Sequence, residues 1–150
     1  MSGEAVAGAA PTSGGPEPGL VGIVLVSHSK EVAESVAALA LGLAGGGRKA
    51  PVTAAGGAPD GGLGTSSEQI TAAAREADRG AGVTVLADLG SAVLTVQALI
   101  AEGDELPPGT RLVDAPFVEG AVAAVVTASA GAPAEAVAAA AGEAYDYRKT

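Results

Sequence analysis

Short apolar runs of strand length alternate regularly with helical patterns through most of this chain. The clearest run is LVGIVLVS (20–27), and the segment KEVAESVAALALGLAGGG, with apolar residues at helical spacing, follows it directly. Further strands are expected at 50–56, 82–90 and 110–116, and each precedes another segment with helical spacing. This alternation predicts an α/β fold with a parallel sheet, right-handed crossovers and helices on both faces.

Four strands connected in this way are expected in the order 2-1-3-4, the flavodoxin-like arrangement. Strands 1 and 3 then lie side by side, and the topological switch point falls between their carboxyl ends, where such folds bind ligands. The chain places Ser27, His28 and Ser29 at the end of strand 1, and Asp88-Leu89-Gly90-Ser91 at the end of strand 3. We therefore expect the single histidine of the chain and an aspartate to meet at this point.

Capping residues are expected at the starts of three helices. Ser29 is positioned to cap a helix that begins at Lys30, and Ser91 to cap the helix that follows strand 3. The segment GTSSEQ offers a capping box, either Ser66 with Gln69 or Thr65 with Glu68. Two Ala- and Val-rich helices are expected to close the chain, between residues 118 and 145.

Residues 1–19 are rich in Gly, Ala, Pro, Ser and Glu and are expected to form a disordered tail, since this composition cannot bury enough surface to offset its ordering entropy. The remainder, residues 20–150, is expected to form one domain. The tail lacks the features of a signal peptide, and the longest uncharged run in the remainder is too short to span a bilayer. We expect a cytoplasmic protein with no membrane association.

The chain carries 17 acidic and 8 basic side chains, for a net charge of −9, and no cysteine. This charge argues against nucleic acid or an anionic membrane as a partner. Disulfides, thiol chemistry and zinc–cysteine sites are excluded. No metal site is expected, because His28 has no second histidine or cysteine to join it.

Other chemistries fit the sequence poorly. Ser91, His28 and Asp88 are nominal parts of a hydrolase triad, but no G-x-S-x-G elbow is present. Neither a complete G-x-G-x-x-G motif nor a P-loop occurs, so no nucleotide cofactor is expected. A histidine at a strand end is also typical of a simple polar cap, and an aspartate before Gly-Ser of a turn.

After these other chemistries are set aside, covalent catalysis by His28 remains as the candidate chemistry. A neutral imidazole nitrogen can accept a phosphoryl group and release it again, because its pKa lies near working pH. The amino ends of the two neighbouring helices offer N–H groups and partial positive charge to a phosphate. Asp88 could accept the second ring N–H, which fixes the tautomer and stabilises positive charge on the ring. Without a nucleotide motif, the phosphoryl group would come from another protein.

Four motifs, VSHS, GT at the start of the second helix, DLGSA and APFVEGA, resemble those of the phosphotransferase (DhaM) subunits of phosphoenolpyruvate-dependent dihydroxyacetone kinases. These subunits are related to the mannose-type enzyme IIA domains of the sugar phosphotransferase system. The resemblance covers roughly residues 20–143. It implies that His28 is phosphorylated on Nε2, that Asp88 orients it, and that Ser29, Thr65, Gly90 and Ser91 lie around the phosphoryl group.

The resemblance also implies a phosphoryl relay from phosphoenolpyruvate through enzyme I and HPr to His28, and then to ADP on the nucleotide-binding kinase subunit. It implies a homodimer, for which the closing helices, residues 118–143, offer apolar faces. Two alternatives stay open. One is an enzyme IIA of a mannose-type sugar permease, and the other is a protein whose phosphorylation state is sensed by a transcription factor.

Overall fold

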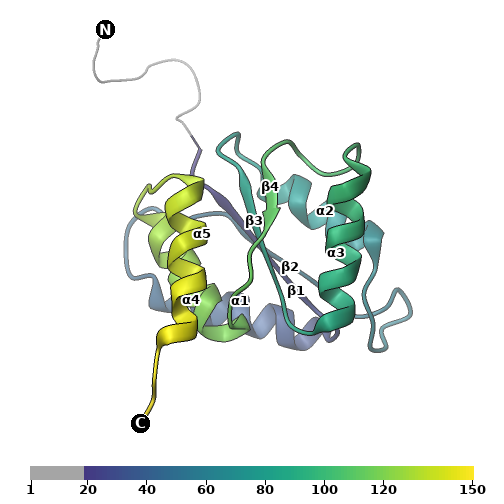
Figure 1. Cartoon of the computed structure of the whole chain (residues 1–150), viewed down its shortest axis with the longest axis horizontal. Helices are drawn as coiled ribbons and strands as arrows, with labels where there is room; N and C mark the ends of the chain where they lie inside the picture. Colours follow the sequence, from purple (N-terminus) through teal and green to yellow (C-terminus); the bar gives the residue numbers. More distant parts are fainter. Residues whose placement is uncertain (1–18) are drawn as a thin grey trace, which may run out of the picture.

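A computed structural model of the chain describes residues 19–150, and the expected tail, residues 1–19, lies outside the described residues except for Gly19. The elements alternate along this part as the sequence predicts (Figure 1). In chain order they are β1 (Gly22–Ser27), α1 (Lys30–Leu43), β2 (Val52–Gly56), α2 (Ser67–Ala77), β3 (Val83–Ala87), α3 (Gly90–Glu102), β4 (Thr110–Leu112), α4 (Phe117–Ser129), α5 (Ala134–Glu143) and a 3-10 turn (Ala144–Asp146).

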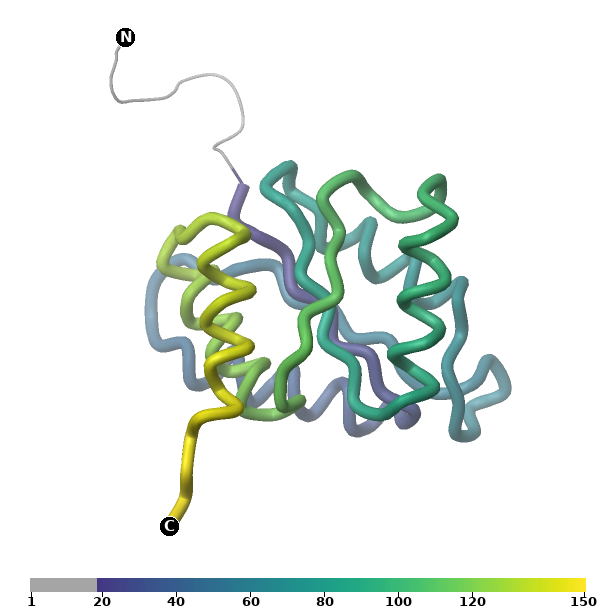
Figure 2. The backbone as a smooth tube through the Cα atoms, viewed as in Figure 1, coloured from purple at the N-terminus to yellow at the C-terminus, as the bar shows by residue number. Residues whose placement is uncertain are grey.

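The four strands form one parallel sheet in the order β2-β1-β3-β4, which confirms the predicted α/β fold and strand order. Helices α1, α4 and α5 cover one face, and α2 and α3 cover the other (Figures 1 and 2). Strands β1 and β3 are the central pair, so the topological switch point lies between their carboxyl ends.

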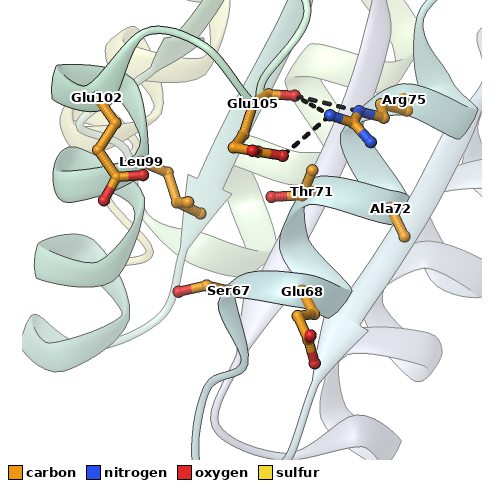
Figure 3. Close-up of a pocket in the computed structure, with 8 residues that line it drawn as sticks. All are labelled: Ser67, Glu68, Thr71, Ala72, Arg75, Leu99, Glu102 and Glu105. Atoms are coloured by element: carbon orange, nitrogen blue, oxygen red, sulfur yellow. Dashed lines mark hydrogen bonds and ion pairs between the residues drawn. The ribbon is translucent and has the colours of Figure 1, made fainter.

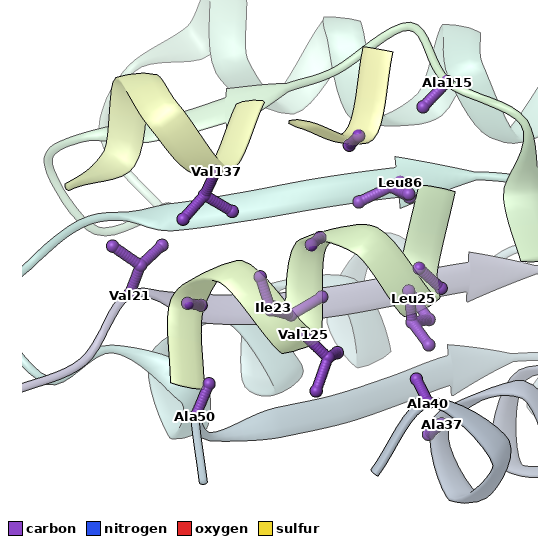
Figure 4. Packing of buried hydrophobic residues seen from close by; sticks show 14 of the residues in the cluster. Val21, Ile23, Leu25, Ala37, Ala40, Ala50, Leu86, Ala115, Val125 and Val137 are labelled. Atoms are coloured by element: carbon purple, nitrogen blue, oxygen red, sulfur yellow. The ribbon is translucent and has the colours of Figure 1, made fainter. Parts of the chain in front are cut away.

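The two faces of the sheet hold separate apolar clusters, because successive side chains of a strand point to opposite faces. Ile23 and Leu25 of β1 pack beneath α4 and α5 with Val125 and Val137 (Figure 4). The intervening strand residues face α2 and α3, where Ile70 and Val96 are among the larger buried side chains. Both faces of β1 are buried, which explains why its sequence reads as a continuous apolar run.

All four expected strands are shorter in the structure: β1 begins at Gly22 and β2 at Val52, each later than predicted, and the other two stop earlier than predicted. The strand predicted for 82–90 ends at Ala87, and the one predicted for 110–116 ends at Leu112. On the edge strand, the N–H of Val113 still donates to the carbonyl of Val85 at 3.0 Å. Beyond it the chain turns away to Pro116, the residue that precedes α4. The sequence patterns predicted where these strands lie. Where β4 stops is decided by how far it pairs with β3.

Glycine allows the end of β2 to lie against the start of α1. A Cβ on Gly56 would lie 2.6 Å from the carbonyl oxygen of Ser29 and 2.9 Å from the Cα of Lys30. Only a residue without a side chain permits this approach, which brings the first turn of α1 beside the sheet. Across residues 19–150, no helix has the length and apolar character needed to cross a bilayer.

Candidate active site

His28 and Asp88 meet at the switch point, as the sequence predicts. His28 directly follows β1 and Asp88 directly follows β3, and the N–H of Asp88 extends the pairing of the two strands by donating to the carbonyl of Val26 at 3.0 Å. The imidazole Nδ1 lies 3.0 Å from Oδ1 of Asp88. The side chain of His28 is 23% exposed and that of Asp88 is 16% exposed, so the pair is sheltered but reachable.

The carboxylate of Asp88 accepts hydrogen bonds at both oxygens. Oδ2 accepts from the hydroxyl of Ser27 at 2.7 Å and from the backbone N–H of His28 at 3.1 Å. Oδ1 accepts from the imidazole of His28 and from the N–H of Leu89, the latter at 2.7 Å. Burial alone would raise the pKa of Asp88, but these four donors, led by Ser27, outweigh it and hold the pKa below its usual value. Asp88 is therefore ionised at neutral pH.

The contacts of the imidazole fix its tautomer. An ionised carboxylate can only accept, so Nδ1 of His28 carries the proton and donates it to Asp88. The neutral ring then has its lone pair on Nε2, which accepts from the hydroxyl of Ser91. Nε2 is thus the nucleophilic nitrogen of the neutral ring, on the side away from Asp88.

Ser91 does not cap α3, and this prediction is wrong. The residue that precedes the helix is Leu89, which provides no side-chain cap, and α3 begins at Gly90. Ser91 is the second helical residue, and its hydroxyl turns to His28 instead of to the helix backbone. The amino end of α3 therefore lies beside Nε2, where its first N–H groups and partial positive charge suit an anion.

Three more residues, Ser29, Gly90 and Thr65, were predicted to lie around the phosphoryl group. Ser29 caps α1, as predicted, by accepting from the N–H of Val32 at 3.3 Å. Gly90 opens α3 next to Ser91. Thr65 lies 3.2 Å from Thr95 through the two hydroxyl oxygens, which ties the loop before α2 to α3. The hydrogen-bond partner of Thr65 is thus on α3 and is not the imidazole of His28.

The sequence places Ser27 at the end of strand 1, but it did not reveal what this residue does in the site. It is 1% exposed, it donates to Asp88, and it accepts from the N–H of Ser29 at 3.0 Å. The sequence signal for Ser27 was a polar residue at the end of an otherwise apolar strand, directly before the histidine. Strand ends that have no functional role show the same pattern. Gly64 was also missed: its N–H donates to the carbonyl of His28 at 2.9 Å, so the glycine-rich loop holds the backbone of His28.

Of the two predicted caps before α2, the structure has the one made by Ser66. The hydroxyl of Ser66 accepts from the N–H of Gln69 at 3.3 Å, so the helix begins at Ser67. A groove of about 460 Å³ runs from this first turn along α2 and α3. It is closed at its far end by Arg75, which pairs with Glu105 at 3.1 Å (Figure 3). The groove carries three glutamates and no imidazole, so the nucleophile lies outside it.

A second pocket, of about 410 Å³, lies on the other side of Asp88, between the start of α3 and the segment after β4. Its wall includes Tyr145, whose hydroxyl donates to Asp114 at 2.8 Å, and that contact raises the pKa of the tyrosine. His28 does not line this pocket. Within residues 19–150, no group of three or more His, Asp or Glu side chains could hold a metal ion.

The chain is similar to several known proteins. Residues 22–138 match the family model EIIA-man, described as the PTS system fructose IIA component. The phosphoryl donor subunit DhaM of PEP-dependent dihydroxyacetone kinase 2 from Listeria innocua is 32% identical over 108 residues, which cover 71% of this chain and 85% of the relative. The DhaM subunit of Escherichia coli K12 is 35% identical over 115 residues, 75% of this chain but only 24% of that longer relative.

Two solved structures share the fold. A crystal structure of a protein of unknown function superposes with a TM-score of 0.67 at 33% identity, covering 81% of this chain and 92% of the other. A sigma-54 interaction domain protein from Enterococcus faecalis superposes with a TM-score of 0.63 at 18% identity, covering 87% and 93%, and shares the fold alone. With a family model that covers most of the described residues, this chain belongs to the mannose-type enzyme IIA family of the phosphotransferase systems.

Proposed function

We propose that the protein is the phosphoryl donor subunit of a dihydroxyacetone kinase. In this proposal His28 accepts a phosphoryl group from phosphorylated HPr and passes it to ADP on the nucleotide-binding kinase subunit. The observation that carries the proposal is the hydrogen-bonded row Asp88–His28–Ser91, which sets the lone pair of the neutral imidazole on Nε2. The relatives named above, which are DhaM subunits, support the choice of acceptor.

In the accepting step, the Nε2 lone pair of His28 attacks phosphorus, and the bond from phosphorus to the donor's imidazole nitrogen breaks. That bonding pair returns to the donor ring, so one N–P bond replaces another. The ring of His28 keeps its Nδ1 proton and becomes cationic. Asp88, 3.0 Å from Nδ1, stabilises this charge as an orienting carboxylate does.

The hydroxyl of Ser91 can change partner during this step. It donates to Nε2 in the resting site, and once phosphorus occupies that position it can donate to a phosphoryl oxygen. In this proposal the first turn of α3, which holds Gly90 and Ser91, and the first turn of α1, which Ser29 caps, offer N–H groups to the same oxygens. Phosphoryl transfer depends mainly on positioning and electrostatics, which these groups supply. In the donating step a terminal oxygen of ADP attacks phosphorus, the Nε2–P bond breaks, and ATP forms.

A homodimer is part of this proposal. Helices α1 and α4 form an apolar groove on the molecular surface, with Leu39, Val118, Val126 and Tyr147 in its wall. Each of these four side chains is more than 40% exposed. Exposed apolar side chains gathered in one groove indicate a protein contact, and a second copy of the chain would cover them symmetrically.

The test is incubation of the protein with phosphoenolpyruvate, enzyme I and HPr, followed by mass measurement. One acid-labile, base-stable phosphoryl group should be added, and His28→Ala should remove it while leaving the melting temperature unchanged within a few degrees. Adding the two kinase subunits with ADP and dihydroxyacetone should then discharge the group. Labelling of His28→Ala at the normal rate would contradict the proposed nucleophile, and a stable phosphoprotein in the presence of the kinase subunits would contradict the proposed acceptor.

A further inference from the structure

A series of hydrogen bonds leads from the backbone of His28 through two other segments and back to its ring. The N–H of Gly64 donates to the carbonyl of His28 at 2.9 Å. The next residue of that loop, Thr65, lies 3.2 Å from Thr95 of α3 through the hydroxyl oxygens. The hydroxyl of Thr95 donates to the carbonyl of Ser91 at 2.9 Å, and the hydroxyl of Ser91 contacts Nε2 of His28. We call Thr65, Thr95 and Ser91 the hydroxyl chain.

The number of protons fixes the direction of each hydrogen bond in the hydroxyl chain. A hydroxyl has one proton to donate, and a backbone carbonyl can only accept. Thr95 therefore gives its proton to the carbonyl of Ser91, and it must accept in its contact with Thr65. Thr65 is then the donor, and its single proton is committed to Thr95. Because phosphoryl oxygens are acceptors, Thr65 cannot donate to one while it keeps this contact.

The hydroxyl chain crosses between two helices that are not closely packed. The groove of about 460 Å³ opens between α2 and α3 from Ser67 onward (Figure 3). At the end of the groove nearer the site, the contact between Thr65 and Thr95 joins the loop before α2 to α3. Because the side chains along the groove leave space between the helices, we infer that this contact sets how far α3 lies from the loop that holds His28.

Thr95 also makes a hydrogen bond within α3. A threonine hydroxyl that bonds to the carbonyl four residues earlier changes the local geometry of a helix. Here that carbonyl belongs to Ser91, so the bond acts on the residue whose side chain contacts Nε2. The hydroxyls of both threonines are bonded to other residues than His28. Any effect of Thr65 and Thr95 on the imidazole therefore passes through Ser91 or through the loop.

We propose that Thr95 is a positioning residue for phosphoryl transfer, and that Thr65 acts through Thr95 instead of binding the phosphoryl group itself. Thr95 holds the first turn of α3 so that the hydroxyl of Ser91 faces Nε2 before transfer and a phosphoryl oxygen after it. The inference rests on the proposed function, because it supposes that His28 carries a phosphoryl group.

The first test measures single-turnover transfer from phosphorylated HPr. Thr95→Val keeps the shape of the side chain and should lower the maximal rate about fivefold, while the concentration of HPr that gives half of that rate stays within about twofold. Thr95→Ser keeps the hydroxyl and should restore the rate to within about twofold of the wild type. Thr71→Val, the same change on α2 and outside the hydroxyl chain, is the matched control and should leave the rate unchanged.

Double variants show through which residue each threonine acts. Ser91→Ala alone should slow transfer about 10-fold. Adding Thr95→Val to it should cost less than about twofold more, because the hydroxyl that Thr95 positions is already gone. Thr65→Val alone should lower the rate about twofold, since the bond from Thr95 to Ser91 remains, and it should add nothing to Thr95→Val.

Nitrogen NMR gives a readout that needs no phosphoryl donor, because the chain has a single histidine. With the ring neutral, the Nε2 resonance reports the hydrogen bond that this nitrogen accepts from Ser91. It should move downfield in Ser91→Ala, and in the same direction but less far in Thr95→Val. It should stay in place in Thr95→Ser and in Thr71→Val. A merely structural role for Thr95 would change the melting temperature and leave this resonance where it is.

The outcomes separate the positioning role from the function on which it rests. A loss in Thr95→Val that Thr95→Ser restores, and that disappears in the Ser91→Ala background, supports the proposal. An equal loss in both backgrounds, or a wild-type Nε2 resonance in Thr95→Val, would overturn it. A loss in Thr65→Val that persists in the Thr95→Val background would overturn the role of Thr65. If HPr fails to phosphorylate the wild type while the Nε2 resonances shift as expected, the proposed function is wrong and Thr95 still positions Ser91.

Discussion

The ionised carboxylate of Asp88 holds the proton of His28 on Nδ1, which leaves Nε2 as the nitrogen that we propose reacts. Asp88→Asn keeps the shape of the side chain but removes the charge that stabilises the cationic phosphorylated ring. We expect the rate of transfer from phosphorylated HPr to fall by roughly 10²–10⁴. Ser91→Ala removes one hydrogen bond to the phosphoryl group, beside backbone donors that remain, and should cost only about 10-fold.

Rapid-quench measurement of phosphoryl transfer, with a melting curve for each variant, compares the two residues. If Asp88 and Ser91 only stabilise the turn after β3, both variants should melt earlier and transfer at the wild-type rate. A wild-type rate for Asp88→Asn would show that the carboxylate does not serve the imidazole.

Ser27 is expected to act through Asp88. Its buried hydroxyl is the donor that lowers the pKa of Asp88 most, so Ser27→Ala should raise that pKa. A carboxyl whose pKa is lowered by folding stabilises the native state above its unfolded pKa and loses that contribution as pH falls through its folded pKa. Ser27→Ala should therefore lower the free energy of unfolding by about 1–2 kcal/mol at pH 7, and the deficit should narrow below about pH 4.

Urea denaturation of the wild type and Ser27→Ala at pH 7, 4 and 3 measures this effect. Ser27→Thr, which keeps the hydroxyl, is the matched control and should recover the pH dependence if the added methyl group is accommodated. A deficit that stays constant from pH 7 to pH 3 would contradict the coupling between Ser27 and Asp88.

The sequence predicted His28 and Asp88 at this site because each follows a strand that its apolar run identifies. It placed Ser27 beside them but did not predict the hydrogen bond from Ser27 to Asp88, since a serine at the end of a strand has many structural roles. It assigned the wrong role to Ser91, because capping preferences describe the residue before a helix and α3 already begins at Gly90. Which way a hydroxyl turns depends on contacts between distant segments.

At the level of whole elements, β3 carries a buried hydroxyl group that has no hydrogen-bond partner among the described residues. Thr84 is fully buried in the middle of β3, and its hydroxyl has no hydrogen-bond partner among the described residues. A buried hydroxyl without a hydrogen-bond partner lowers the free energy of unfolding, and the nearly isosteric substitution Thr84→Val removes that hydroxyl. The free energy of unfolding should therefore rise by about 1–2 kcal/mol. Thr53 of β2 is the matched control, because its hydroxyl donates to the carbonyl of Ala73 at 2.8 Å.

Thr53→Val should lower the free energy of unfolding by about 1 kcal/mol, the opposite sign. Chemical denaturation of both variants under the same conditions gives the comparison. If Thr84→Val is the less stable protein, the hydroxyl of Thr84 has a partner, such as a bound water.

The elements themselves were largely predictable. Continuous apolar runs identified β1 and β3, helical periodicity and caps identified α1 and α2, and the strand order followed from alternation. The extent of β4 could not be predicted, because it depends on how far the edge strand keeps pairing with β3. The loop from Gly57 to Thr65 shows no periodic pattern, and its contact with His28 depends on the tertiary fold.

For the whole molecule, the groove between α1 and α4 leads us to expect a homodimer. The double variant Val118→Asp with Val126→Asp places two charges in this groove and should give a monomer. Both valines are 42% exposed, so the monomer itself should remain folded. Sedimentation velocity at tens of micromolar should show a dimer for the wild type and a monomer for the variant. A wild-type monomer, or a dimeric variant, would contradict this contact.

The chemistry proposed for the molecule depends on which nitrogen carries the phosphoryl group. The protein can be phosphorylated by phosphoenolpyruvate, enzyme I and HPr and then observed by phosphorus and nitrogen NMR. Because Asp88 holds the proton on Nδ1 and Ser91 faces the lone pair of Nε2, the phosphoryl group is predicted on Nε2 of His28, with Nδ1 protonated. Phosphorylation on Nδ1, or on a serine hydroxyl, would contradict it.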